Sequence, residues 1–199
     1  MAQGLRALTG IKPAARRLDT LGVTCRGMPA DGAQTHPMTH RSTLQDYSPA
    51  PFDEPALLRQ AQTLQRAAHT DSTRTLLRGK NLGLLCDAPD SDSALLFRDA
   101  ASQLGAHVAH VRSNLSRSST PQEVQHTARI LGRLYDALEC QGMPAALVEQ
   151  LGREAGVPVY DGIGSPEHPT AALACMLGAA STADAQRYVV QAILLSTIV

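Results

Sequence analysis

From Pro55 onward the chain alternates between segments whose apolar residues have helical spacing and short apolar runs typical of buried strands. Leu57, Ala61 and Leu64 share one face of the first such helix, and Gly105 marks the end of the second. This alternation predicts parallel βαβ units, and therefore an α/β fold of three layers, a parallel sheet with helices on both faces. Predicted helices cover 56–68, 93–104, 122–135, 144–154, 169–177 and 184–199, and predicted strands cover 81–87, 107–111, 137–140 and 157–160.

The turn after the first predicted strand is the most informative polar segment. Ligands of parallel sheets bind at the carboxyl ends of the strands. A turn that leaves such a strand and opens a helix commonly holds a phosphate, through backbone N–H groups and the positive end of the helix dipole. Here the turn carries Asp90 and Asp92 and no cation. We therefore expect the turn itself to repel an anion.

Composition excludes several classes of partner. The 18 basic and 18 acidic side chains balance, so no overall field attracts nucleic acid or an anionic membrane. Aromatic residues make up only 3%, which disfavours stacking on single-stranded nucleic acid. No apolar run reaches the roughly 20 residues of a membrane span. Neither nucleic acid nor a membrane is an expected partner.

The four cysteines are scattered, without the paired spacing of a zinc site. Cys86 and Cys140 lie in apolar strand-like runs, where a cysteine is usually a small buried hydrophobe. We predict a reduced protein of the cytoplasm with no metal and no cofactor.

Residues 1–50 differ in composition from the rest. Basic residues exceed acidic ones in this stretch, and glycine, alanine, proline and threonine are frequent. It faintly resembles a transit peptide but lacks a clear amphipathic pattern. We expect a disordered leader, and Met28 and Met38 leave open whether residues 1–37 belong to the mature protein.

Five runs of sequence give the chain a strong family likeness. They are 78–82 (RGKNL), 105–108 (GAHV), 127–136 (TARILGRLYD), 156–159 (GVPV) and 168–170 (HPT). In this order they resemble the carbamoyl-phosphate-binding half of the aspartate/ornithine carbamoyltransferases, ornithine carbamoyltransferase most closely. The resemblance implies the fold of the carbamoyltransferase N-terminal domain for 51–178, and a returning C-terminal helix, 183–199, that packs back on it. It also implies that the link 178–182 replaces the amino-acid-binding domain.

The same resemblance shows how the chain departs from the chemistry of the family. In the family, an S-T-R-T-R turn, an arginine after the third strand and an H-P-x-Q motif bind the phosphate and polarise the carbamoyl carbonyl. The chain has 90–94 (DSDSA) at the turn, Gln141 at the arginine and Ala171 at the glutamine. His168 is the one retained catalytic candidate, although a lone histidine after a strand is more often structural, here a helix-start residue kept for the fold. The degenerate carbamoyl-phosphate site would comprise Asp90, Ser91, Asp92, Ser93, Gln141 and His168.

Two functions are consistent with these residues. The favoured one is a truncated, degenerate ornithine carbamoyltransferase-like protein without catalysis, acting by association. The resemblance then implies a homotrimer, or a mixed trimer with a full-length relative. The alternative is an enzyme or small-molecule binder with a remodelled site, in which Ser91, Ser93 and His168 bind a neutral or cationic ligand. If it were an enzyme, the resemblance implies carbamoyl transfer to ornithine, in arginine metabolism. A dinucleotide-binding domain is disfavoured, because no G-x-G-x-x-G follows a strand.

Overall fold

A computed structural model of the chain describes residues 53–68, 73, 75–179 and 181–199, so the leader predicted at 1–50 lies outside the described residues. Helices and strands alternate through most of this part, as the sequence predicts. In chain order they are α1 (Glu54–Ala67), β1 (Asn81–Leu85), α2 (Asp92–Gln103), β2 (His107–Val111), α3 (Pro121–Leu134), β3 (Ala137–Cys140), α4 (Ala145–Ala155), β4 (Val159–Asp161), the 3₁₀ helix η2 (Pro169–Ala171), α5 (Ala172–Cys175) and α6 (Thr182–Ile198).

The four strands form one parallel sheet in the order β2-β1-β3-β4. Asp136, just before β3, ties β1 and β3 together at the end of the sheet where both strands begin. Its carboxylate accepts a hydrogen bond from the backbone N–H of Asn81 at 2.8 Å and one from Lys80 Nζ at 3.1 Å. The α/β fold with a parallel sheet is thereby confirmed.

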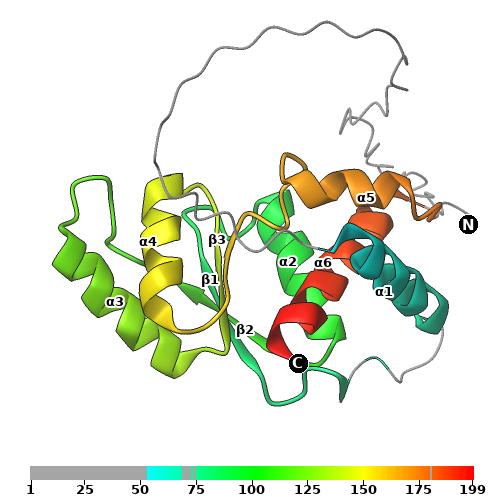
Figure 1. The fold of residues 1–199 in the computed structure, drawn as a ribbon, viewed down its shortest axis with the longest axis horizontal. Coiled ribbons are helices and arrows are strands. Elements are labelled where there is room, and N and C mark those ends of the chain that lie inside the picture. The colour runs from blue at the N-terminus through cyan, green and yellow to red at the C-terminus, as the bar shows by residue number, and fades with distance from the viewer. Residues whose placement is uncertain (1–52, 69–72, 74, 180) are drawn as a thin grey trace, which may run out of the picture. The chain divides into compact units, whose positions relative to one another are not determined.

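Alternate residues of the strands supply two hydrophobic cores, one on each face of the sheet. On β1, Leu82 and Leu84 enter the core formed with α1, α2, α5 and α6. Leu85 enters the core formed with α3 and α4. Figure 1 shows these two groups of helices on opposite sides of the strands. The central strands β1 and β3 are buried on both faces, as a parallel sheet requires, whereas the edge strand β2 has no buried residue.

Helix α6 supplies much of the first core although it lies at the end of the sequence. It packs against α1, α2 and α5 (Figure 1). Val190, Ala192, Ile193 and Leu194 are completely buried along it. Its length is 17 residues, and no helix in the described part of the chain is both long and apolar enough to cross a lipid bilayer.

Some predicted elements differ at their ends. The first predicted strand stops at Leu85, so Cys86 lies past the strand and is only half-buried. The expectation of a buried Cys86 was wrong, whereas Cys140 is fully buried. Strand β4 starts at Val159, after Pro158, which has no N–H to give to a ladder. The predicted helix 169–177 is shorter and opens as a 3₁₀ turn, in which the Ala171 N–H donates to the His168 carbonyl.

Gly132 explains why α3 and α4 pack so closely. A Cβ atom built on Gly132 would lie 1.9 Å from the Ala155 carbonyl oxygen. That oxygen belongs to the backbone, so it cannot move aside as a flexible side chain could. The glycine in the TARILGRLYD run is therefore a packing requirement of the α3–α4 contact.

Gly132→Ala should destabilise the protein by about 2 kcal/mol, because the added methyl group forces the two helices apart. Urea unfolding followed by circular dichroism measures the change. The matched control is Arg133→Ala, an exposed position on the same helix, which should stay within about 0.5 kcal/mol of the wild type. Equal stability of the two variants would contradict the close contact.

Candidate functional site

A cavity of about 650 Å³ opens where β1, β3 and β4 end at their carboxyl termini. Three loops form it: the turn before α2, the residues just after β3 and the segment between β4 and η2. Its location agrees with the rule that ligands of parallel sheets bind beyond the strand ends. The lining residues are Cys86, Asp87, Ala88, Ser91, Ser93, Gln141, Gly142, Asp161, Gly162, Ser165, Glu167, His168 and Pro169.

The structure brings four of the six predicted site residues together. Ser91, Ser93, Gln141 and His168 line the cavity, whereas Asp90 and Asp92 are exposed and do not line it. Asp92 lies in the first turn of α2, where a carboxylate interacts favourably with the positive end of the helix dipole. The Ser91 hydroxyl caps the same helix by accepting a hydrogen bond from the Ala94 N–H at 3.3 Å.

His168 lines the cavity and also begins a helix. Its Nδ1 accepts a hydrogen bond from the Thr170 N–H at 3.3 Å and lies 2.7 Å from the Thr170 hydroxyl. An Nδ1 that accepts from a backbone N–H carries no proton, so the proton of the neutral ring is on Nε2. Burial lowers the pKa of His168, while nearby Asp161 raises it. At neutral pH His168 is an uncharged donor.

Glu139 is a residue that the sequence analysis did not identify. It lies on β3, is completely buried, and is hydrogen-bonded to residues of the cavity loops. Its Oε1 accepts from Gln141 Nε2 at 3.0 Å, and its Oε2 accepts from the Ile163 N–H at 3.4 Å. Burial raises the pKa of Glu139 to about 7, although these hydrogen bonds oppose the shift. A signal existed in the sequence, because a charged residue inside a four-residue buried strand is unusual.

The charges around the cavity are mainly negative. Asp87, Asp161 and Glu167 line it, and no lysine or arginine is found among the lining residues. Burial raises the pKa of Asp161, with His168 acting in the opposite direction. Within the described ranges, no three histidine, cysteine, aspartate or glutamate side chains are grouped so that they could hold a metal ion.

Cys86 is another lining residue, and its environment does not activate it. Burial raises the pKa of the thiol, and this effect outweighs the nearby Arg98 guanidinium. Arg98 itself donates to the Pro89 carbonyl at 2.6 Å. A thiol with a raised pKa is mostly protonated at neutral pH, and the protonated form is a poor nucleophile.

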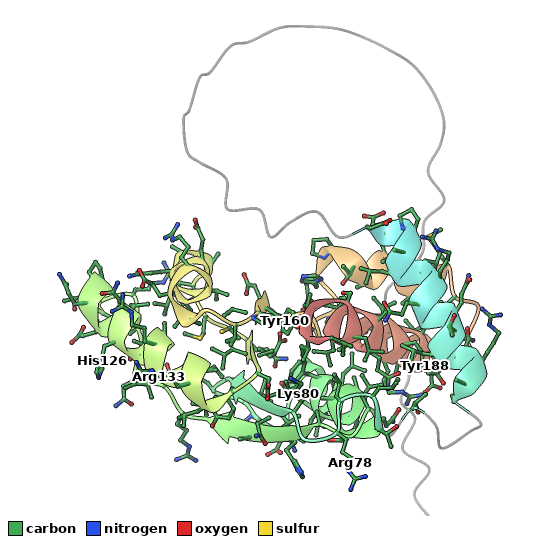
Figure 2. The ribbon with its side chains drawn as sticks, turned by 60° about the horizontal axis from the view of Figure 1, so that its bottom comes forward. Arg78, Lys80, His126, Arg133, Tyr160 and Tyr188 are labelled. Carbon is green, nitrogen blue, oxygen red and sulfur yellow. The ribbon has the colours of Figure 1, made fainter. Side chains whose placement is uncertain are left out.

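Gly164 sets the spacing of two cavity walls. A Cβ atom on Gly164 would lie 2.5 Å from the Ser93 carbonyl oxygen, so the loop after β4 lies directly against the first turn of α2. Helix α6 supports the same region from behind. Gln186 donates to the Gly164 carbonyl at 3.4 Å, and Thr197 is hydrogen-bonded to the Tyr160 hydroxyl. Figure 2 shows Tyr160 beside α6.

A second, smaller cavity of about 250 Å³ lies next to the first and shares Cys86, Asp87, Gln141 and Gly142 with it. Its remaining lining comes from the ends of β1 and β2, the serine-rich loop after β2 and the two residues before α4. Arg117 lies on this second cavity and is exposed. The larger cavity is thus lined by three carboxylates, whereas the wall of the smaller one carries the cation Arg117 beside Asp87.

Residues 39–179 match the model of the aspartate/ornithine carbamoyltransferase carbamoyl-P binding domain. Among characterised proteins, the catabolic ornithine carbamoyltransferase of Pseudomonas putida is 36% identical over 121 residues, which are 61% of this chain and 36% of that protein. The ornithine carbamoyltransferase of Actinobacillus pleuropneumoniae matches with the same identity and coverage. The chain thus spans 36% of the length of these relatives.

Solved structures give the same result. The ornithine carbamoyltransferase from Pyrococcus furiosus matches with a TM-score of 0.53 and 27% identity, over 62% of this chain and 40% of that one. The enzyme from Thermus thermophilus matches with a TM-score of 0.52 and 29% identity, over 67% of this chain and 46% of that one.

Glu139 should make the stability of the protein fall as pH rises. The unfolded carboxyl loses its proton near pH 4.5 and the folded one near pH 7. Between these values the folded state holds more protons, so the free energy of unfolding falls by about 3 kcal/mol across the interval. Glu139→Gln removes this titration. As the pH rises through the interval, the free energy of unfolding of the variant, relative to that of the wild type, should therefore increase by the same amount. Urea unfolding at pH 5, 6, 7 and 8 measures the difference.

The control is Glu149→Gln, the same substitution at a carboxylate on α4 that pairs with Arg153 at 2.7 Å. Its stability difference from the wild type should change little over the same pH range. Parallel pH profiles for Glu139→Gln and the wild type would show that Glu139 does not titrate as described.

Proposed function

Because the chain belongs to the aspartate/ornithine carbamoyltransferase family, we propose that it is a carbamoyltransferase-like domain that keeps the family fold without catalysing carbamoyl transfer. One observation carries the proposal: three carboxylates line the cavity at the strand ends, and among the described residues no lysine or arginine lines it. Transfer of a group from an acyl phosphate needs cations and N–H donors on the phosphate and donors on the reacting carbonyl.

The positions that resemble the phosphate-binding residues of the family support this proposal. Ala94 aligns with the second arginine of the family's turn, and its side chain is completely buried in the core that α2 shares with α6. A guanidinium at that position would need space that the core now fills. Gln141 aligns with the arginine after the third strand, and its Nε2 is already hydrogen-bonded to Glu139.

The start of α2 gives further support. A helix N-terminus favours an anion, and in the family that anion is the phosphate of the substrate. In this chain Asp92 places a carboxylate in the first turn of the helix. The Asp92 carboxylate thus already makes the favourable interaction with the helix dipole that an anionic ligand would otherwise make.

We also propose that residues 178–182 take the place of the amino-acid-binding domain of longer relatives. Residues 176–181 connect α5 directly to α6, and the two helices pack against each other. On this basis the chain has no second domain between them to bring an amino-acid substrate to the cavity.

A carbamoyltransferase-like domain without catalysis would act by binding other protein chains, and α3 offers a surface for that contact. Ile130 and Leu134 lie one helical turn apart and are 45% and 60% exposed. Adjacent exposed apolar side chains are typical of an interaction surface. We propose that a further copy of this chain, or a full-length relative, covers this pair in a trimer.

Carbamoyl phosphate should not bind to this protein. Calorimetric titration of the full chain with carbamoyl phosphate, and separately with inorganic phosphate, should give no saturable heat at millimolar ligand. The ornithine carbamoyltransferase of Pseudomonas putida, titrated in parallel, is the positive control. Saturable binding to this chain, or carbamoylation of ornithine above the uncatalysed rate, would overturn the proposal. Arg117→Ala then tests whether any bound phosphate lies in the smaller cavity.

The chain should form a species of three subunits, three times its 21.1 kDa mass, in light scattering after size-exclusion chromatography. Ile130→Lys combined with Leu134→Lys should convert it to single chains, because charged side chains oppose burial in an interface. Met176→Lys, at another exposed apolar residue, is the matched control. A wild-type protein of 21.1 kDa that also fails to enter trimers of a full-length relative would contradict association.

A further inference from the structure

One loop both lines the larger cavity and covers a buried carboxyl group. This loop, residues 162–165 between β4 and η2, contributes its two end residues to the cavity lining. Its middle contacts Glu139, because the Ile163 N–H donates to Glu139 Oε2 at 3.4 Å and the Gly164 N–H also stabilises the carboxylate. Glu139 itself is completely buried and does not line the cavity. The 162–165 loop therefore lies between Glu139 and the cavity.

The contacts that hold the 162–165 loop closed are local. At its start the Gly162 N–H donates to the Cys140 carbonyl at 2.9 Å, and Gln186 of α6 reaches the Gly164 carbonyl at 3.4 Å. The side chain of Ile163, which is 2% exposed, is its apolar anchor. Gly162 has a φ of +70°, a conformation that glycine adopts without strain, so the backbone can turn there. Opening of the loop exposes one buried side chain and leaves the sheet intact, so it costs less than global unfolding.

In the described part of the chain, no cation offsets the charge that Glu139 acquires when it ionises. The titratable groups that act on it are Asp161 and Tyr160 on β4, Cys140 on β3 and Cys86 after β1, and each of them is negative when charged. No salt bridge among the described residues includes Glu139. A buried carboxylate without a counter-charge is costly, whereas the same group in water is not. Ionisation therefore favours a conformation in which water reaches Glu139.

We propose that the 162–165 loop is a lid that opens more often when Glu139 loses its proton, so that pH controls how far the larger cavity extends. With the lid closed, the carboxyl group is sealed from water and keeps its proton up to about pH 7. With the lid open, water hydrates the carboxylate, and the space around it joins the cavity. The open form is a minor state whose population rises with pH. This inference goes beyond the proposed function, because it holds whichever ligand the cavity binds.

Hydrogen exchange of the Ile163 amide, followed by NMR of the full chain from pH 5 to pH 8, measures the opening of the lid. The exchange rate is divided by that of an unstructured peptide at the same pH, which gives the opening constant. In the wild type this constant should rise by up to about 70-fold, because the carboxyl pKa is 4.5 when hydrated and about 7 when buried. In Glu139→Gln it should not depend on pH. Glu149→Gln, the same change on α4 outside the cavity, should keep the wild-type profile.

Urea separates opening of the lid from global unfolding, which also exposes Glu139. The lid exposes little surface, so the Ile163 opening constant should not change in dilute urea. The Leu138 amide on β3, which donates to the Pro158 carbonyl at 2.9 Å, should have a smaller opening constant that rises with urea. Equal opening constants at Ile163 and Leu138 would mean that only global unfolding exposes Glu139, and the lid would be overturned.

Ile163→Ala removes the apolar anchor of the lid without changing the titrating group. The opening constant at residue 163 should increase at least tenfold at every pH, because burial of the isoleucine side chain stabilises the closed form. Its rise between pH 5 and pH 8 should remain. Thermal unfolding establishes that each variant is folded. An opening constant equal to that of the wild type would contradict the anchor and with it the lid.

The wild-type profile tests the lid even without a variant, since an opening constant that is independent of pH would overturn it. A pH dependence that persists in Glu139→Gln would belong to Asp161 or His168, which also titrate beside the loop, and would overturn the role of Glu139. None of these results depends on whether carbamoyl phosphate binds, so failure of the lid and failure of the proposed function are distinguishable.

Discussion

A sheet built only from parallel strands must be covered on both faces, and the remaining organisation of this chain depends on that requirement. Helices α3 and α4 cover one face and come from the middle of the sequence. The other face is covered by α1 and α2 together with α6, the last helix, which buries Val190, Ile193 and Leu194 completely. Without α6 the apolar residues of that core would be exposed to water. The chain therefore keeps its final helix against the first part of the domain.

The same helix connects core and cavity. Thr197 near its end is hydrogen-bonded to Tyr160 on β4, and Gln186 near its start reaches the loop that carries Gly164. Residues far apart in the sequence thus hold one wall of the cavity in place. The stability of the sheet and the shape of the site are therefore properties of the same set of contacts.

Most of the fold was predictable because its signals are local. Strand alternation, helical spacing and Gly105 gave the element order, and β2 and β3 were predicted with their observed ends. The errors arose where the deciding interaction lies elsewhere in the molecule. Cys86 was misplaced because the sequence does not show where β1 stops pairing. The predicted helix at 169–177 was too long because the 3₁₀ turn at His168 interrupts the α-helical pattern.

The site was predictable only in part, since it depends on which face of a strand or helix each side chain occupies. The sequence located the turn before α2, but Asp90 and Asp92 proved to be exposed residues outside the lining. The carboxylates that line the cavity are Asp87, Asp161 and Glu167, at the ends of strands and in loops. Glu139 was missed because one of its partners, the Ile163 N–H, is distant in the sequence and becomes a neighbour only after β3 and β4 pair.

Gly164 has a consequence for how this cavity can change over evolutionary time. The loop after β4 touches the carbonyl of Ser93 because residue 164 has no side chain. A single methyl group there would act as a wedge between the loop and the first turn of α2. The added methyl group would press against the Ser93 backbone, which cannot turn aside as a side chain could. The loop and the helix would therefore move apart as whole segments and widen the mouth of the cavity. The size of the opening therefore depends on a residue that does not line the cavity. One small substitution at that residue would let the cavity admit a ligand of another size.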